Sequence, residues 1–186
     1  MQFAGRPSWQ VRSDTSSLPL HAALYVREAC GVPMTDDGPP PLLVTPPVSE
    51  ERVTSADWHA WWRELLLAEK LTWMLTESPW PPAPEALAGT LDRLGDEPFR
   101  WVSRTVDDAD RYRPPEYSLP VQNAVQRLER EFGRRSLMNV RIEGLAVQGD
   151  WIDVRSDGSV VLVSWGALDH AADWITDALR PAFRRA

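Results

Sequence analysis

Cysteine is almost absent from this chain of 186 residues, since Cys30 is the only one. A single cysteine cannot form an internal disulfide, and without a Cys-x-x-Cys pair the chain lacks the usual ligands of a structural zinc ion. Cys30 falls at the end of a predicted helix, where the helix dipole opposes a thiolate, so we expect a buried, inert thiol rather than a nucleophile. This cysteine content is typical of a reducing compartment, and we predict a cytoplasmic protein.

Long hydrophobic runs are missing as well. The most hydrophobic window, residues 61–74, contains four charged side chains, and the first seven residues contain no apolar stretch. A membrane helix needs about 20 predominantly apolar residues, and a signal peptide needs an apolar core. The sequence therefore predicts neither a membrane span nor a secretion signal.

Histidine is scarce, and its three copies fall on three separate predicted helices. Neither His-x-His nor His-Glu-x-x-His spacing occurs among His21, His59 and His170, so we predict no metal site. His170 and Asp173 lie one turn apart and could supply two ligands, but a surface histidine beside a carboxylate is far commoner. We also predict no cofactor.

Lysine occurs once, as Lys70, so arginine supplies 19 of the 20 basic side chains. This preference is typical of a GC-rich genome. The 27 acidic side chains outnumber the basic ones and give a net charge of -7. Affinity for nucleic acid comes largely from basic side chains, so we predict no nucleic-acid partner. A protein partner with a basic or neutral surface is easier to accommodate.

Proline, in contrast, is abundant, with 17 copies that divide the first part of the chain into short blocks. Helical periodicity with capping residues predicts helices over three ranges, with residues 33–50 as a loop and residues 96–117 as a polar, irregular linker. The predicted helices span residues 18–30, 54–75 and 84–94. We place a domain boundary in the linker, so that residues 1–110 form a helical region with proline-rich linkers, which need not fold independently.

Residues 111–186 show clearer patterns. An apolar stripe predicts a helix over 118–132, and alternating residues predict a strand over 140–147 with a bulge at Gly144. Two further strands, 151–155 and 160–165, flank a turn, and the second is apolar on both faces, as in a central strand. A last helix is predicted over 168–180. The predicted fold is α+β, with the helical part packed on an α-β-β-β-α unit that has an antiparallel sheet.

This element order is shared with double-stranded-RNA-binding domains, in which basic residues at the start of the final helix contact phosphates. Here the corresponding residues include Asp169 and Asp173, which would repel phosphates. We interpret the shared order as a topological coincidence.

Tryptophan is unusually frequent, with ten copies, and three of them occur close together at Trp58, Trp61 and Trp62. On a helix these three share one face, and Glu69 projects from the middle of the same face. One interpretation is central packing, in which Glu69 pairs with an arginine or an indole N-H. The other is a pocket walled by the three indoles, with Glu69 or His59 as its polar group.

A second set of residues is predicted to meet a partner protein. Asp169, Asp173 and Asp177 recur at helical spacing and form an acidic stripe beside His170. The alternative is a solvated helix face. Trp80, within a proline-rich run, is predicted either to pack on a neighbouring element or to dock on a partner, because a polyproline-like segment cannot bury an indole by itself.

No nucleophile elbow, phosphate-binding loop or dinucleotide fingerprint occurs in the sequence, so we do not predict an enzyme. The leading hypothesis is a non-catalytic protein-interaction factor, such as an adaptor, accessory, chaperone-like or toxin-neutralising protein, that uses acidic and aromatic surface. The alternative hypothesis is a small cytosolic enzyme or small-molecule-binding protein built on the tryptophan pocket.

Overall fold

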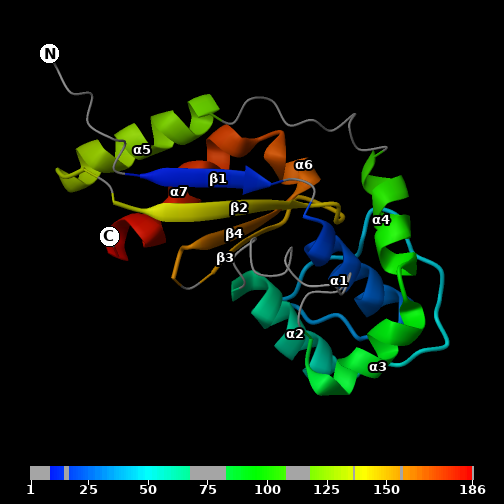
Figure 1. Ribbon diagram of the computed structural model, residues 1–186. Helices are drawn as coiled ribbons and strands as arrows, with labels where there is room; N and C mark the ends of the chain where they lie inside the picture. The colour runs from blue at the N-terminus through cyan, green and yellow to red at the C-terminus, as the bar shows by residue number, and fades with distance from the viewer. Residues whose placement is uncertain are drawn as a thin grey trace, which may run out of the picture. The chain divides into compact units, whose positions relative to one another are not determined.

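A computed structural model describes residues 9–14, 17–67, 83–107, 118–135, 137–155 and 157–185. Within them the chain is α+β, with seven helices and a four-stranded mixed sheet (Figure 1). It forms two compact units. The sheet unit comprises residues 1–15, 112–145 and 149–186, and the helical unit comprises residues 16–111 and 146–148. No helix of the described residues is long and apolar enough to cross a lipid bilayer.

The sheet has the strand order β1-β2-β4-β3. Strand β2 pairs with both β1 and β4 in parallel, and only β3 runs antiparallel, alongside β4. The strands are β1 (Gln10–Asp14), β2 (Asn139–Leu145), β3 (Ile152–Val154) and β4 (Val160–Ser164).

The prediction of an antiparallel three-stranded sheet is therefore wrong in its pairing, although the hairpin of β3 and β4 is confirmed. Strand β4 is buried along its whole length, whereas β3 is short and half-exposed. A strand that is apolar on both faces is most stable in the centre of a sheet, and a polar strand is most stable at an edge. Strand β4 therefore lies inside the sheet, with β3 on one side of it as the edge strand and β2 on the other side.

The bulge predicted at Gly144 is absent from β2. Its pairing with β4 continues one to one from Arg141 with Val160 to Leu145 with Ser164. The change in apolar parity has another cause: every residue of β2 from Ile142 onward is buried, so side chains on both faces of the strand are apolar or paired. Strand β1, which supplies one of these neighbours, was not predicted.

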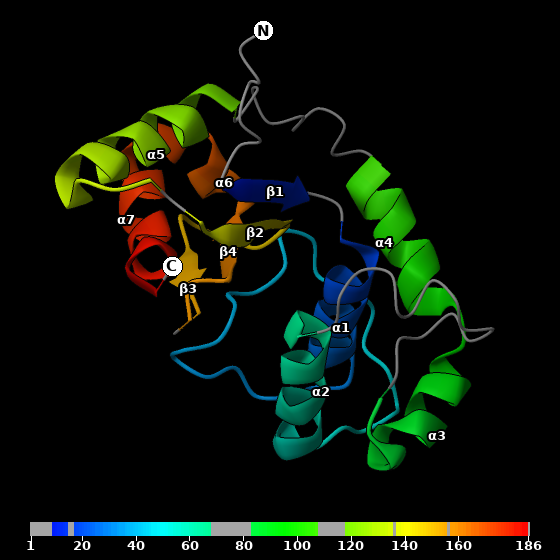
Figure 2. The ribbon, with the colours of Figure 1, turned by 60° about the vertical axis from the view of Figure 1, so that its left-hand side comes forward.

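Three helices complete the sheet unit: α5 (Ser118–Phe132), α6 (Trp165–Leu168) and α7 (Ala171–Arg185). Helix α5 agrees with the prediction and lies beside α7, where Phe132 stacks on Phe183 at 5.2 Å between ring centroids (Figure 2). The predicted last helix, 168–180, is wrong at both ends. The side-chain oxygen of Ser164 accepts a hydrogen bond from the Ala167 N-H and starts a separate short helix. Helix α7 then continues through Pro181, after which Ala182 and Phe183 are buried.

The helical unit contains α1 (Leu18–Ala29), α2 (Ser55–Leu67), α3 (Glu85–Leu94) and α4 (Glu97–Asp107). Helix α1 is buried on nearly all sides and packs against α2 and α4. The first three agree with predicted helices, except that residues 68–75 of the second prediction lie outside the described residues.

Helix α4 overturns the prediction that residues 96–117 form an irregular linker. Its inward side chains, Pro98, Trp101, Val102 and Thr105, have the i, i+3, i+4, i+7 spacing of an amphipathic helix. Trp101 makes an edge-on contact with Tyr25 of α1, at 5.3 Å between ring centroids. The stripe contains only two strongly apolar residues, so packing on α1 supplies the stability that its composition alone does not predict.

Candidate functional site

The three clustered tryptophans of α2 belong to the core of the helical unit. Trp58, Trp61 and Trp62 are 1%, 0% and 3% exposed. The rings of Trp58 and Trp62 stack at 5.3 Å, and the Trp58 Nε1-H donates to the carbonyl oxygen of Ala23 at 2.8 Å. These indoles therefore contribute packing energy to α1 and α2, and they present no surface to a partner.

Of the two polar residues predicted beside the tryptophans, the structure describes His59 but not Glu69. His59 is half-buried, with its ring edge-on to Trp58 at 5.1 Å between centroids. Glu69 and Trp80 lie outside the described residues. A pocket that combines Glu69 with the three indoles stays a prediction.

A buried arginine on α1 organises the neighbouring loop. Arg27 is 2% exposed and donates from its two Nη atoms to the carbonyl oxygens of Pro39, at 2.5 Å, and Pro40, at 2.7 Å. It also pairs with Glu28 at 3.0 Å and lies 5.7 Å from the Trp58 ring centroid. Burial lowers the pKa of the guanidinium, and the hydrogen bond that it donates to Glu28 opposes that shift. Arg27 thus joins the tryptophan core to the proline-rich loop.

Residues 33–50, here named the proline segment, are irregular but firmly attached at several points. The Leu42 N-H donates to the Glu28 carboxylate at 2.6 Å, and the Leu43 N-H donates to the Ala146 carbonyl at 2.8 Å. Gln148 donates its backbone N-H to Pro41 and its side-chain amide to Leu42. Further along, the Ser49 N-H donates to Ala29 at 2.8 Å. The segment therefore has a defined conformation, although it lacks regular secondary structure.

The proline segment exposes an unusual number of apolar side chains. Eight large hydrophobic side chains of the described residues are exposed, and four of them lie in this one segment. They are Met34 (57%), Leu43 (46%), Val44 (50%) and Val48 (87%). The segment also contains three acidic residues and no basic residue. It therefore combines exposed apolar side chains with a net negative charge.

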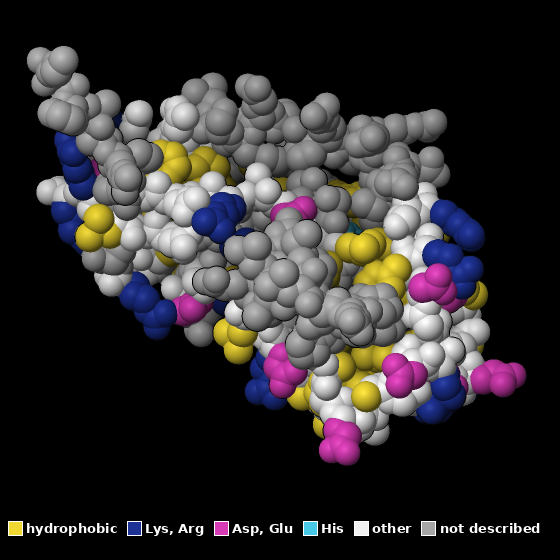
Figure 3. All heavy atoms as spheres, in the orientation of Figure 1, with side chains coloured by type: hydrophobic (Ala, Val, Ile, Leu, Met, Phe, Trp, Pro, Cys, Tyr) yellow, Lys and Arg dark blue, Asp and Glu magenta, His cyan; other side chains and the backbone are white. Residues whose placement is uncertain are grey.

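Negative charge is concentrated in the helical unit as a whole. That unit carries sixteen acidic and eight basic side chains, a net charge of -8, whereas the sheet unit carries eleven acidic and twelve basic ones, a net charge of +1. Acidic side chains are visible over α2 and α3 in Figure 3. The net charge of the whole chain, -7, therefore comes from the helical unit, because the sheet unit is nearly neutral.

The predicted acidic stripe is exposed but is not a single helix face. Asp169 ends α6 and His170 follows it in a turn, so only Asp173 and Asp177 lie on α7. Asp177 is 3.5 Å from Arg180, which partly balances its charge. Their exposure is compatible with a partner surface and equally with a solvated face.

The sheet assembles a charged group that the sequence patterns did not predict. Arg141 and Glu143 on β2 form an ion pair at 3.0 Å, and the Glu143 side chain is 4% exposed. Their register partners on β1 are Arg12 and Asp14. Since residues in register on parallel strands share a face, the four side chains lie on one face of the sheet. Alternation along β2 was visible in the sequence, but the pairing with β1 was not.

Neither cysteine nor metal chemistry gains support from the described residues. Cys30 is 1% exposed, and burial, followed by the charge of Glu51, raises the pKa of its thiol. In the described part of the chain no group of three His, Cys, Asp or Glu side chains is arranged to hold a metal ion.

No protein-family model, curated protein or solved structure matches this chain.

His21 gives a test of how the helical unit holds residues 146–148. Its Nε2 accepts the Ala146 N-H at 3.0 Å, so its Nδ1 carries the proton and donates to the Ser17 carbonyl at 2.8 Å. Replacing His21, which is 1% exposed, with phenylalanine removes both side-chain bonds and leaves the buried Ala146 N-H without this acceptor, whereas the Ser17 carbonyl still accepts the backbone N-H of residue 21. We expect the free energy of unfolding to fall by about 1–3 kcal/mol in urea denaturation. The exposed His170→Phe variant is the control, and equal stability of the two variants would contradict this prediction.

Proposed function

We propose that this chain is a non-catalytic protein-interaction factor, and that it binds its partner through the proline segment. The observation that carries the proposal is the exposure of Met34, Leu43, Val44 and Val48 on a segment whose backbone is fixed by buried hydrogen bonds. Large exposed apolar surfaces on soluble proteins commonly mark interaction sites. A fixed backbone also lowers the entropy cost of binding, because the segment does not have to order when the partner arrives.

The charge of the segment supports one kind of partner. Along the sequence Asp36 and Asp37 fall between Met34 and Leu43, Glu50 follows Val48, and no basic residue occurs between residues 33 and 50. A partner surface with an apolar centre and a basic rim would complement this arrangement. Mutating rim charges changes mainly the rate of association, whereas apolar anchors account for most of the affinity. The partner is therefore expected to be a protein with an apolar patch bordered by arginine or lysine.

The test compares three versions of the full chain as bait in lysate of the native organism, with quantitative mass spectrometry of the captured proteins. The first is the natural sequence and the second carries Leu43→Ser, Val44→Ser and Val48→Ser. The third is a matched control whose changes affect exposed apolar residues elsewhere. Its substitutions are Leu67→Ser, Leu137→Ser and Ile152→Thr.

We expect a small set of proteins that the natural chain and the control capture, and that the proline-segment variant captures about tenfold less, as removal of interface anchors does. Each of these proteins is then purified and its affinity for the three baits is measured directly. Equal capture by all three baits would show that the proline segment is not the binding surface.

A further inference from the structure

A surface of opposite charge lies on the sheet unit, along the outward side of α5. The inward side of this helix is buried and consists of Val121, Ala124, Val125 and Leu128. The opposite side consists of Gln122, Asn123, Gln126, Arg127 and Arg130, all exposed. Arg134 and Arg135 follow at the end of the helix. The outward side of α5 therefore carries two arginines, and the carboxylates that flank it are the half-buried Glu129 and the exposed Glu131, which pairs with Arg180.

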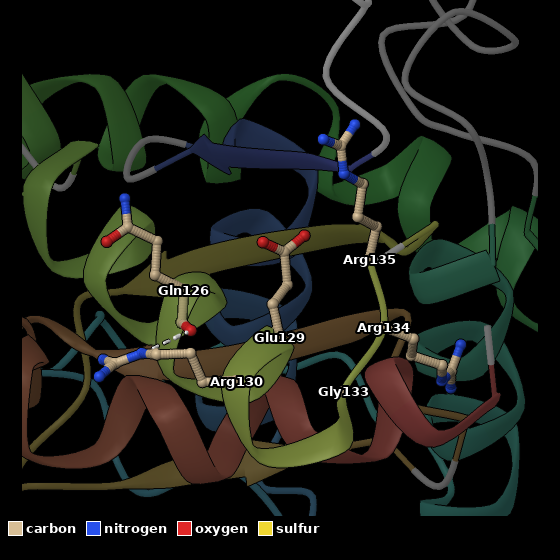
Figure 4. Close-up of a pocket in the computed structure, with 6 residues that line it drawn as sticks. All are labelled: Gln126, Glu129, Arg130, Gly133, Arg134 and Arg135. Atoms are coloured by element: carbon tan, nitrogen blue, oxygen red, sulfur yellow. Dashed lines mark hydrogen bonds between the residues drawn. The ribbon is translucent and has the colours of Figure 1, made fainter.

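We name Arg127, Arg130, Arg134 and Arg135 the arginine ridge. Three of the four border an open surface depression of about 420 Å³, together with Gln126, Glu129 and Gly133. Glu129 supplies the one carboxylate there, against three guanidinium groups. In Figure 4 the side chains of Arg130, Arg134 and Arg135 point in different directions. They do not converge on one point, so the surface suits an extended anionic chain rather than a small anion.

Stabilisation of the end of α5 explains only some of the four arginines of the ridge. Basic side chains near a helix C-terminus interact favourably with the helix dipole, and Arg134 also donates to the Phe183 carbonyl and lies over its ring at 5.1 Å. The dipole effect decays within the last turn, however, and Arg127 precedes that turn. Among the described residues Arg127 and Arg135 form no ion pair, whereas Arg180 pairs with Glu131 and Asp177. Arg127 and Arg135 thus present positive charge that no carboxylate of the described residues balances, whereas Arg134 is partly used in its contact with Phe183.

We propose that the arginine ridge binds a carboxylate-rich, extended segment of a separate partner protein. Arginine pairs well with carboxylates because its planar fork can donate two parallel hydrogen bonds. Nucleic acid fits the surface less well. Sites for single strands usually stack bases on exposed aromatic rings, and Phe132 here is half-buried and stacked on Phe183. Phosphates favour helix N-termini, whereas the ridge lies at the C-terminal end of α5.

The test uses a fluorescent octaglutamate peptide as the probe and the full chain as the receptor, with binding measured by anisotropy. The variant Arg127→Gln, Arg130→Gln, Arg135→Gln removes three ridge charges and keeps Arg134, which contacts Phe183. The control Arg52→Gln, Arg63→Gln, Arg104→Gln removes three exposed arginines of the helical unit. Both triple variants have the same net charge, and circular dichroism and thermal unfolding confirm that each is folded.

We expect the ridge variant to bind the peptide about tenfold more weakly than the natural chain, and the control to change the affinity less than twofold. Raising the salt concentration from about 0.05 M to about 0.3 M should weaken binding, since exposed charges are screened. Absence of binding, or an equal loss in both variants, would overturn the proposal. So would tighter binding of a short duplex DNA that depends on the ridge. A salt-sensitive dimer of the natural chain that is lost in the ridge variant would assign the surface to a second copy instead.

Discussion

Replacing Arg27 with methionine is expected to lower the free energy of unfolding by about 3–5 kcal/mol, the usual cost of breaking a buried charged pair. Methionine keeps most of the apolar stem but removes every donor. The carbonyls of Pro39 and Pro40 then lose the hydrogen bonds that Arg27 donates, and the Glu28 carboxylate keeps only its bond from the Leu42 N-H. Since Pro39 is buried, water cannot replace the lost donor without opening the loop.

Urea denaturation of three variants separates charge from geometry. Arg27→Lys keeps the positive charge but cannot donate to two carbonyls and a carboxylate from one planar group, so we expect an intermediate loss. Arg63→Met removes an exposed arginine of α2 and should change stability by less than about 0.5 kcal/mol. Buried ion pairs can sometimes be replaced by apolar residues without loss. If Arg27→Met is as stable as the natural chain, the hydrogen bonds from Arg27 do not hold the proline segment in place.

Replacing Gly158 with alanine is expected to destabilise the sheet unit by about 3 kcal/mol or more. Gly158 lies in the hairpin turn between β3 and β4 with a φ of 68°, where residues other than glycine are strained. A Cβ atom there would also lie 2.4 Å from the backbone nitrogen of Ala182 and 2.9 Å from its Cα. These atoms belong to α7 and cannot rotate away as a side chain would. The turn itself is held by Asp157, which accepts hydrogen bonds from Ser159.

Gly149 provides the matched control. Its φ of 73° carries the same strain, but a Cβ atom there would have no neighbour within 4 Å. Gly149→Ala should therefore cost only the backbone strain, about 1–2 kcal/mol. Thermal and urea unfolding of the two variants isolate the steric cost of the contact between the turn and α7. Equal losses would show that the turn can move away from α7.

Elements whose signals are local could be predicted from the sequence. Helix α5 has its apolar stripe and ends at Gly133, whose φ is 65°, and the β3–β4 hairpin has a turn with Gly158 at positive φ. In both cases the residues that decide the conformation lie within a few positions of one another. Helix α4 was missed although its spacing was helical, because its inward stripe has only two strongly apolar residues, too few to identify the helix without its packing partner α1.

The sheet could not be predicted in the same way. Strand β1 pairs Gln10 with Asn139, and strand β2 pairs with β4 rather than with β3, which follows it along the chain. Such pairings depend on which strand is buried on both faces, and that is known only when all layers are in place. For the same reason the sequence did not predict the charged group on the sheet, which consists of Arg12, Asp14, Arg141 and Glu143.

The sequence by itself determined the fold class, most of the helices, the hairpin and the isolation of its one cysteine, because each depends on composition or short-range periodicity. Only the tertiary structure decided which side chains are exposed. It placed the three tryptophans in the core, where the sequence allowed either central packing or a pocket wall, and it exposed the apolar residues of a loop that had no distinguishing pattern. The physical reason is that exposure depends on packing between distant segments. That loop is held by Arg27 of α1 and by Ala146 and Gln148, which lie far along the chain.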